Sequence, residues 1–332
     1  MEKREQSRLG GLIDAVVEQI DARLPADQAA AVGTFAARFF AQVDPDDLED
    51  LPLADLYGAV LSQWHFISQR TGGSRVRVSN PRLDEQGWEC PHTVIEIVGE
   101  DMPFLVDSIT MEVARQGLTL HLIIHPVMNI QRDAQGRLQH VRERGEQGEG
   151  ACLESIMHLE VDRRSDPADL SALQQGLEHV LADVRAAVGD WPAMRSRLGE
   201  IIDGLAACPA SVDAAEVDEV RAFLEWLAAD NFVLLGCRDY SLVGGDDGHE
   251  LHVVAGSGLG LLHGDGEEGA SRSFAALPPQ LRAQAHLPKL LTLTKSNSRS
   301  TVHRPGYLDF IGIKAFDAEG RVTGERRVIG LL

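Results

Sequence analysis

The stretch TVIEIVGEDMPFLVDSITMEVARQGLTLHLIIHP (93–126) decides the fold of this chain. Its beginning, TVIEIV (93–98), is dominated by β-branched residues and predicts a strand. The residues that follow, 99–117, repeat their apolar positions with the period of a helix, and TLHLIIH (119–125) again predicts a strand. The stretch therefore predicts a strand, a helix and a strand in direct succession.

The helix expected over 99–117 has both of its ends marked in the sequence. Pro103 suits the first turn of a helix, and the Asp101 carboxylate is placed to cap the free N–H groups there. Gly117 suits the position that follows the last turn. One helix face is expected to point into the core, and it carries Leu105, Ile109 and Val113.

The neighbouring segments complete an α+β domain. RVRVS (75–79) and CLESIMHLEV (152–161) predict two more strands, and residues 166–189 predict an amphipathic helix. Turns or loops are expected between 126 and 151, among them GEQGEG (145–150). The order strand, helix, strand, strand, helix is that of ferredoxin-like (βαββαβ-type) domains. No clear strand follows the last helix, so we expect 75–79 to take the free sheet edge.

Helices and a second sheet flank this domain. Apolar residues recur at spacings of three and four before the domain and again after it, which predicts helices on both sides. Short strands follow to the C-terminal end, among them STVHR (300–304), with a turn at DAEG (317–320). The sequence thus predicts four parts: a helical N-terminal segment 1–72, a ferredoxin-like domain 73–190, a helical linker 191–230 and a mostly antiparallel sheet domain 231–332.

Composition restricts the location of the chain and its partners. It has 31 Lys and Arg against 51 Asp and Glu, a formal charge of −20 that disfavours nucleic acid and anionic membranes as partners. The start, MEKREQSRLGG, lacks the apolar stretch of a signal peptide. The four cysteines form no CxxC pair and indicate free thiols in a reducing compartment: Cys90, Cys152, Cys208 and Cys237. We expect a cytoplasmic protein.

Signatures of catalysis and of cofactor binding are missing from the sequence. GSGLGLLHG (256–264) has the wrong glycine spacing for a dinucleotide fingerprint, and Gly264 and Gly266 interrupt any helix after it, which favours a hairpin or loop. His121 and His125 would lie about 13 Å apart on one strand face, too far to share a metal ion. We expect no catalytic, cofactor or metal site in this chain.

Positive charge gathers near the C-terminal end of this acidic chain. Such a cluster of basic residues is typical of a solvated sheet face whose cations pair with local acids. The alternative is a binding site for an acidic ligand or for another part of a larger protein. Its members are Lys289, Lys295, Arg299, His303, Arg304 and Lys314.

The strand-to-helix junction GEDMPFLVDS (99–108) offers a physical mechanism for binding. A helix start presents N–H groups and the positive end of the dipole, which suits a ligand carboxylate, and Asp107 one turn later suits an amino group. The alternative is an ordinary capped helix start. For a small amino-acid effector we expect the binding residues Asp101, Met102, Pro103, Phe104, Leu105 and Asp107.

DMPFLVDSITMEVARQGLTLHLIIHP (101–126) resembles the ACT-domain pattern, in which Asp-x-Pro-Gly-Leu-Leu opens the first helix. More narrowly, TVIEIVGEDMPFLVDSITMEVARQGLTLHLIIHPV and LTLTKSNSRSTVHRPGYLDFIGIKAFDAEGRVTGERRVIGLL (291–332) resemble the N-terminal region of the large bacterial NAD-specific glutamate dehydrogenases. The resemblance implies an ACT-like domain at 73–190 and a PAS-like domain at 231–332. Phe104 departs from the pattern, because it stands where the pattern has the glycine that lets a ligand approach the backbone.

The resemblance also implies a function. It implies a non-catalytic regulatory and assembly segment of an enzyme that converts L-glutamate to 2-oxoglutarate and ammonium. NAD would belong to the parent enzyme, and the implied partners are the downstream catalytic region of the same polypeptide, further copies in a homo-oligomer and an amino-acid effector. The alternative is a structural oligomerisation module without effector binding.

Overall fold

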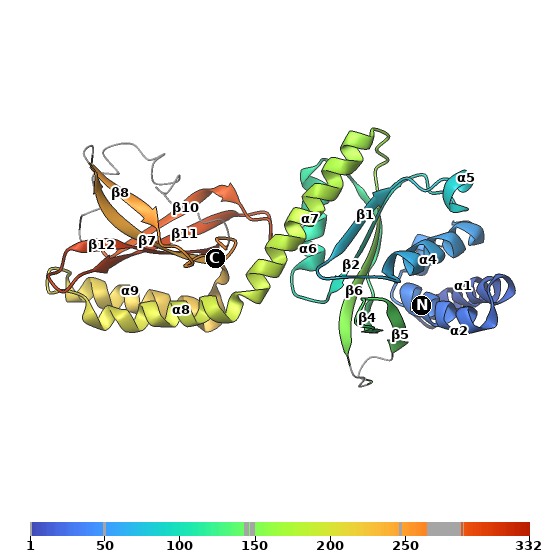
Figure 1. Ribbon diagram of the computed structural model, residues 1–332, viewed down its shortest axis with the longest axis horizontal. Helices are drawn as coiled ribbons and strands as arrows, with labels where there is room; N and C mark the ends of the chain where they lie inside the picture. The colour runs from blue at the N-terminus through green and yellow to red at the C-terminus, as the bar shows by residue number, and fades with distance from the viewer. Residues whose placement is uncertain are drawn as a thin grey trace. The chain divides into compact units, whose positions relative to one another are not determined.

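The computed structural model describes residues 2–48, 51–142, 146, 150–245, 248–263, 287 and 289–332. The chain divides into two compact units, Met1–Leu181 (unit 1) and Ala182–Leu332 (unit 2), and each is α+β (Figure 1). Most of the predicted loop 145–150 lies outside the described residues, and so do Gly264 and Gly266. None of the described helices is long and apolar enough to cross a membrane.

Unit 1 is built on an antiparallel sheet with six described strands in the order β1-β2-β6-β4-β5, and β3 also pairs with β6. The strands are β1 (Arg75–Ser79), β2 (Thr93–Glu100), β3 (Leu120–Ile124), β4 (Val127–Arg132), β5 (Leu138–Arg142) and β6 (Ala151–Val161). The neighbours β2, β6 and β3 form the expected ferredoxin-like centre. β1 pairs with β2 at the edge, which confirms the expected place of residues 75–79.

The prediction of turns between 126 and 151 was wrong for two segments. β4 and β5 lie there and pair with each other, and β4 also pairs with β6 from Val127 opposite Ser155. Their sequences, VMNIQR and LQHVR, mix apolar and polar residues without a strong strand pattern. Their conformation therefore depends on the long neighbour β6, which supplies hydrogen bonds that local sequence does not reveal.

The helix expected over 99–117 begins later than predicted. It is α6 (Leu105–Arg115), and Phe104 precedes it in the left-handed region with φ 72°. No side chain caps α6, and the backbone N–H of Asp101 instead donates to the Leu153 carbonyl at 3.0 Å. Pro103 in the first turn and Asp101 as the cap were therefore wrong. The predicted core face is confirmed, because Leu105, Ile109 and Val113 are all buried.

Helices cover both faces of the unit 1 sheet. α6 and α7 lie on one face, and α1, α2 and α4 lie on the other (Figure 1). Phe35 and Phe39 share one core with Val98 and Ile124, so the N-terminal helices and the sheet belong to the same packed unit. The other helices that the structure describes in and next to this unit are α1 (Glu2–Arg23), α2 (Ala26–Phe40), α3 (Pro45–Leu48), α4 (Leu53–Ile67), α5 (Leu83–Gln86) and α7 (Pro167–Gly189).

Unit 2 combines an antiparallel sheet with the helical segment that precedes it. The described strands have the order β10-β11-β12-β7-β8, and β9 pairs with β7. α8 and α9 run along one face of this sheet and bury Leu224 against Ile311 and Val328 (Figure 1). The elements are α8 (Trp191–Gly204), η1 (Leu205–Ala207), α9 (Ala214–Trp226), η2 (Leu227–Asn231), β7 (Val233–Gly245), β8 (Gly248–Val253), β9 (Leu259–Gly260), β10 (Leu291–Arg299), β11 (Tyr307–Phe316) and β12 (Val322–Leu331).

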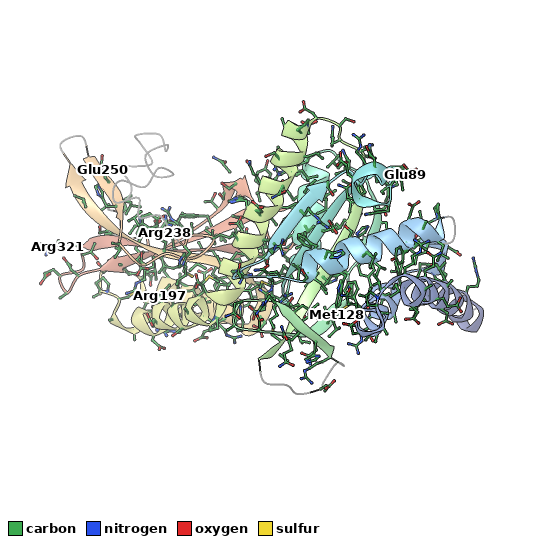
Figure 2. The ribbon with its side chains drawn as sticks, turned by 45° about the vertical axis from the view of Figure 1, so that its right-hand side comes forward. Glu89, Met128, Arg197, Arg238, Glu250 and Arg321 are labelled. Atoms are coloured by element: carbon green, nitrogen blue, oxygen red, sulfur yellow. The ribbon has the colours of Figure 1, made fainter. Side chains whose placement is uncertain are left out.

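Two connecting segments in unit 2 can be compared with the sequence, which predicted a strand for one and a turn for the other. STVHR (300–304) is a tight bend and not the predicted strand, because the Ser300 N–H closes it onto the Gly306 carbonyl at 2.8 Å. The predicted turn DAEG (317–320) is confirmed between β11 and β12, where Arg321 forms an ion pair with Asp317 at 2.8 Å (Figure 2). The sequence predicted a strand at 300–304, but β10 and β11 pair antiparallel, which requires the chain to reverse direction between them.

The described part of 256–264 agrees with the predicted hairpin or loop, and two lysines of the basic cluster have the predicted acidic partners. Residues 256–263 form a loop with the short strand β9, and the Gly260 N–H donates to the Asp190 carboxylate at 2.9 Å. Two members of the basic cluster pair with local acids, Lys295 with Asp309 at 2.7 Å and Lys314 with Glu325 at 3.4 Å. The predicted pairing with local acids is confirmed for these two lysines, but only Lys295 is solvated as predicted, because the Lys314 side chain is 8% exposed.

Candidate functional site

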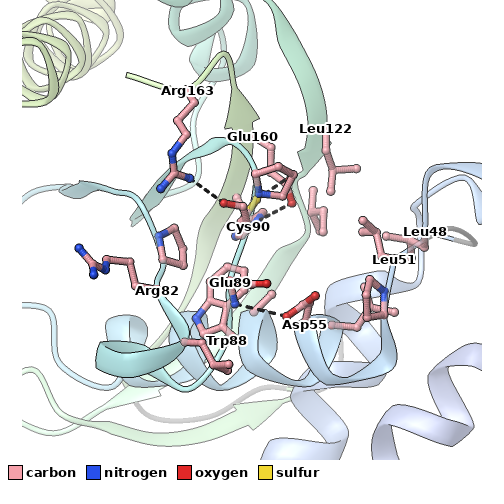
Figure 3. Close-up of a pocket in the computed structure, with 18 of the residues that line it drawn as sticks. Leu48, Leu51, Asp55, Arg82, Trp88, Glu89, Cys90, Leu122, Glu160 and Arg163 are labelled. Carbon is pink, nitrogen blue, oxygen red and sulfur yellow. Dashed lines mark hydrogen bonds and ion pairs between the residues drawn. The ribbon is translucent and has the colours of Figure 1, made fainter. Parts of the chain in front are cut away.

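A cleft of about 960 Å³ lies in unit 1, on the sheet face that carries the N-terminal helices. This volume is typical of small-molecule sites. The walls come from α4, from the segment around α5 and from strands β3 and β6 (Figure 3). Apolar side chains dominate the lining, with Phe40, Leu48, Leu51, Leu56, Trp88, Leu122 and Ile124. Polar groups interrupt it, with Asp55, Arg82, Asp84, Glu89, Cys90, His158, Glu160 and Arg163.

The wall that contains Trp88 depends on a glycine in α4. A Cβ at Gly58 would lie 2.2 Å from the Trp88 Cβ, so the indole packs directly against the helix backbone. Asp55 of the same helix accepts the Glu89 N–H at 3.3 Å (Figure 3). α4 therefore holds the segment before β2 in place and gives the cleft a fixed wall.

Buried carboxylates line the sheet face that meets the N-terminal helices. Glu154 on β6 is fully buried and binds two arginines, Arg70 at 2.9 Å and Arg132 at 2.7 Å. Glu96 on β2 is buried as well and forms an ion pair with Arg77. Each of these carboxylates has a permanent cation as its partner, as a buried charge requires.

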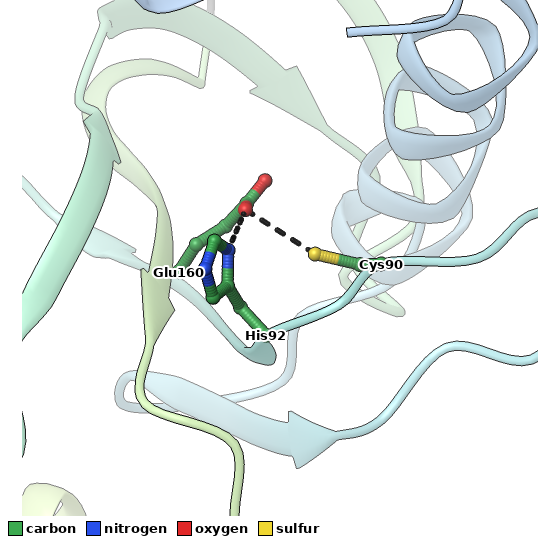
Figure 4. Close-up of side chains that lie close together, drawn as sticks. All are labelled: Cys90, His92 and Glu160. Atoms are coloured by element: carbon green, nitrogen blue, oxygen red, sulfur yellow. Dashed lines mark hydrogen bonds and ion pairs between the residues drawn. The ribbon is translucent and has the colours of Figure 1, made fainter.

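Glu160 of β6 lies in the cleft and has partners of a different kind. Its Oε2 accepts from the Cys90 thiol at 3.2 Å and lies 2.8 Å from His92 Nδ1 (Figure 4). Burial raises the pKa of this carboxyl, and the contacts with His158, His92 and Cys90 outweigh burial and lower it to about 2. Burial and the Glu160 charge raise the pKa of the Cys90 thiol to about 12. The carboxylate is thus ionised beside a protonated thiol.

His158 forms part of the same wall and lacks ordinary hydrogen bonding. It is 1% exposed, and neither ring nitrogen has a hydrogen-bond partner among the described residues. Its Nε2 lies 3.6 Å from Glu160 Oε1, beyond hydrogen-bond distance. The ring packs edge-on against Phe39, with centroids 6.0 Å apart. A buried imidazole without a hydrogen-bond partner among the described residues is unusual.

The structure does not bring the predicted effector residues to the cleft. None of the residues 101–105 and 107 lines it. Asp101, Pro103 and Asp107 are exposed, Met102 and Phe104 are half-buried, and Leu105 belongs to the core. The segment lies at the start of α6, on the opposite face of the sheet (Figure 1).

His121 and His125 bind different partners, as the predicted separation on the strand requires. His121 Nε2 lies 2.8 Å from Asp162 Oδ1, and His125 Nε2 lies 2.7 Å from Ser155 Oγ. The group that sequence reasoning missed is Cys90, His92 and Glu160. Its only local signal was the run Cys90-Pro91-His92, because Glu160 lies some seventy residues further along and reaches the others through the pairing of β2 with β6.

Comparison with known proteins shows that the cleft lies inside a range that matches a domain family. Residues 35–177 match the family model "Glutamate dehydrogenase, ACT1 domain", and every residue that lines the cleft lies within this range. The chain is 41% identical over 330 residues to the NAD-specific glutamate dehydrogenase of Halomonas elongata, which covers 99% of the chain and 20% of that relative. The chain corresponds to the N-terminal region of the large NAD-specific glutamate dehydrogenases.

Two other NAD-specific glutamate dehydrogenases match most of the chain and a similarly small share of their own length. The one from Pseudomonas aeruginosa is 35% identical over 301 residues, which are 90% of the chain and 18% of the relative. The one from Mycobacterium tuberculosis is 26% identical over 282 residues, 85% of the chain and 16% of the relative. The chain thus spans about one fifth of the length of the relatives it matches, and these relatives are longer polypeptides.

Proposed function

We propose that this chain is a regulatory segment of a large NAD-dependent glutamate dehydrogenase and that the cleft of unit 1 binds a small-molecule effector. The parent reaction is the oxidative deamination of L-glutamate to 2-oxoglutarate and ammonium. NAD and the catalytic groups belong to the downstream catalytic region of the same polypeptide. The observation that carries the proposal is that the ACT1-matching range 35–177 contains the whole lining of the cleft.

The chemistry of the cleft fits a small zwitterion such as an amino acid. Arg82 and Arg163 supply cations for a carboxylate, and Asp55 and Glu89 supply carboxylates for an ammonium group. The apolar lining favours the side chain of such a ligand, since a few placed polar groups in an apolar cavity are typical of ligand sites. Binding regulates the parent enzyme when the effector prefers one of its conformations, with a coupling of about 1–3 kcal/mol.

The start of α6 is a second proposed location for the effector. A helix N-terminus attracts a carboxylate, and Asp107 lies in the first turn of α6. Phe104 argues against this location, because a bulky side chain occupies the left-handed position before the helix. The cleft is therefore the first choice, and the experiment below distinguishes the two.

We further propose that residues 231–332 form a PAS-like domain and that the parent enzyme is a cytoplasmic homo-oligomer. The support for the PAS-like fold is a single antiparallel sheet in which the first and last long strands, β7 and β12, are central neighbours. A purely structural oligomerisation module is less well supported. The family match falls on an ACT domain, and the same range contains a cleft of ligand size.

The direct test is a thermal-shift screen of the purified chain against amino acids and small dicarboxylates. A ligand that binds only the native state at one hundred times its Kd stabilises it by about 2.7 kcal/mol. For a unit of this size, that corresponds to a rise in Tm of about 5–10 °C. The proposal expects at least one compound to give a saturable rise.

Two matched arginine variants locate the binding. Arg82→Gln removes a cation of the cleft, and Arg137→Gln removes a cation elsewhere in unit 1. The two side chains are 58% and 64% exposed; Arg82 pairs with Asp84 and, at 3.8 Å, with Glu85, and Arg137 pairs with Asp133. The ligand-induced rise should shrink in Arg82→Gln and persist in Arg137→Gln. A rise that survives Arg82→Gln and disappears in Asp107→Ala would move the effector to α6, and no rise with any compound would contradict the proposal.

A further inference from the structure

We propose that Cys90, His92 and Glu160 form a binding site for a divalent transition-metal ion, and that zinc fits it best. The site lies in unit 1 where the segment before β2 meets the end of β6. It is independent of the proposed regulatory function, because it follows from the side chains of this chain alone.

The three candidate ligand atoms converge on one point. Cys90 Sγ and His92 Nδ1 lie 3.2 Å and 2.8 Å from the same atom, Glu160 Oε2, and the three atoms lie within 4.8 Å of one another (Figure 4). Zinc bonds of about 2.0–2.3 Å in tetrahedral geometry place ligand atoms roughly 3.2–3.8 Å apart. The two distances to Glu160 Oε2 are shorter than or at the lower end of this range, so an outward shift of the carboxylate by a few tenths of an ångström brings it to the spacing that the ion requires.

The balance of charge favours a cation at this place. The buried Glu154 binds Arg70 and Arg132, whereas Glu160 has no Arg or Lys in ion-pair contact among the described residues. In the ranges that the structure describes, its partners are a thiol and imidazoles. A divalent ion that takes the Glu160 carboxylate and the Cys90 thiolate forms a neutral cluster, and the thiol proton leaves to solvent. The ion then neutralises the buried Glu160 carboxylate, as the arginines do for Glu154.

The side chains around the three candidate ligands can hydrogen-bond to them and orient them, as a metal site requires. His158 is nine-tenths buried or more, has no hydrogen-bond partner within the described part of the chain and lies 3.6 Å from the other oxygen of Glu160. It can donate to that oxygen once the ion holds the first one. On the other side, the His121 ring stacks on His92 with centroids 4.2 Å apart, and Asp162 holds His121 at 2.8 Å. These contacts fix the orientation of the His92 ring.

The ligand set is mixed and incomplete, which indicates the class of site. Thiolate, imidazole and carboxylate together suit zinc or a similar late transition metal, whereas magnesium and calcium take oxygen ligands only. Three protein ligands leave a fourth tetrahedral position. Cys90 and Glu160 line the cleft, so this position is open to water or to a ligand in the cleft.

The experiment uses the full chain after treatment with a chelator. Zinc affinity is measured by competition with a chromophoric chelator, and cobalt is added as a spectroscopic probe, because a thiolate-to-cobalt charge-transfer band reports sulfur coordination. The wild type should bind one zinc ion per chain and show the band. Cys90→Ser should lose the band and most of the affinity, and the matched control Cys152→Ser, an exposed thiol of the same unit, should keep both.

The positioning role of His158 has its own readout. His158→Asn should keep the cobalt–thiolate band and weaken zinc binding by about 10–100-fold. A purely structural role would instead lower the melting temperature and leave the affinity of the folded protein unchanged.

A measurement on the wild type protects the test from variants that do not fold. Zinc should slow alkylation of Cys90 and leave the alkylation rate of Cys152 unchanged, as followed by mass spectrometry of the peptides. The proposal is overturned by the absence of stoichiometric zinc, by a cobalt band that survives Cys90→Ser, or by zinc that protects neither thiol.

Discussion

Glu154→Gln is expected to be among the most destabilising conservative substitutions in unit 1. The carboxylate is 0% exposed and joins three parts of the unit, since Arg70 follows α4, Arg132 lies on β4 and Glu154 itself lies on β6. Arg132 also donates to the Ile67 carbonyl at the end of α4, at 2.9 Å. Glutamine keeps the size of the side chain and removes the charge, so two nearly buried guanidinium groups lose their counter-ion.

The expected magnitude follows from this burial. Removing one partner of a buried ion pair costs about 3–5 kcal/mol, against a total stability of about 5–15 kcal/mol for a domain. The corresponding fall in Tm is about 6–20 °C. Asp46→Asn is the control, because its pair with Arg8 is 3.3 Å long and the Asp46 side chain is 76% exposed. That substitution should cost at most about 1 kcal/mol.

The assay is urea denaturation followed by far-UV circular dichroism and by tryptophan fluorescence. The two probes also show whether the two units unfold in separate transitions, in which case each transition is fitted by itself. A loss in Glu154→Gln as small as that in Asp46→Asn would contradict this expectation. It would mean that water solvates the two arginines and that they do not tie the N-terminal helices to the sheet.

Three further predictions concern the core, the thiols and acid stability. Ile109→Ala should cost about 2–5 kcal/mol in urea melts and Thr110→Ala, on another face of α6, much less; equal losses would mean that the face is wrong. In the native protein Cys152 should react with a thiol reagent first, whereas burial, which raises the pKa of Cys237 to about 12, should leave Cys237 unreactive until unfolding; comparable rates would contradict the structure. The pKa of Glu160 is lower in the folded chain, about 2, than its ordinary value of 4.5, so its stabilising effect is complete above pH 4.5 and is lost as the pH falls towards 2. The difference in unfolding free energy between the wild type and Glu160→Gln should shrink across that window, and a difference that is constant with pH would show that the carboxylate titrates normally.

Periodicity in the sequence was enough to predict the elements that contribute a continuous apolar face. Leu105, Ile109 and Val113 lie in the core as their spacing indicates, and the same holds for Leu173 and Leu177 of α7. The edge position of β1 also followed from the sequence, because no other segment offered a strand for that side of the sheet.

The parts that escaped prediction depend on contacts between distant segments. β4 and β5 have weak local patterns and are stabilised by pairing with β6 and with each other. The start of α6 was misplaced because Phe104 adopts a positive φ, a conformation that sequence rules assign to glycine. The group around Glu160 arises from the register of β2 and β6, which sets Thr93 opposite Val161. The spacing of residues along the sequence does not predict that register.

Amide chemical shifts of the isotope-labelled chain show whether the cleft of unit 1 is the effector site of a regulatory segment. An amino acid or dicarboxylate that raises the Tm is titrated in, and the perturbed residues are mapped. We expect saturable shifts within 81–91 and 158–163, the two segments that contribute residues to the cleft, and their loss in Arg82→Gln but not in Arg137→Gln. Saturable shifts confined to 231–332 would contradict it, because the effector would then bind unit 2 and leave the ACT-matching cleft without a ligand.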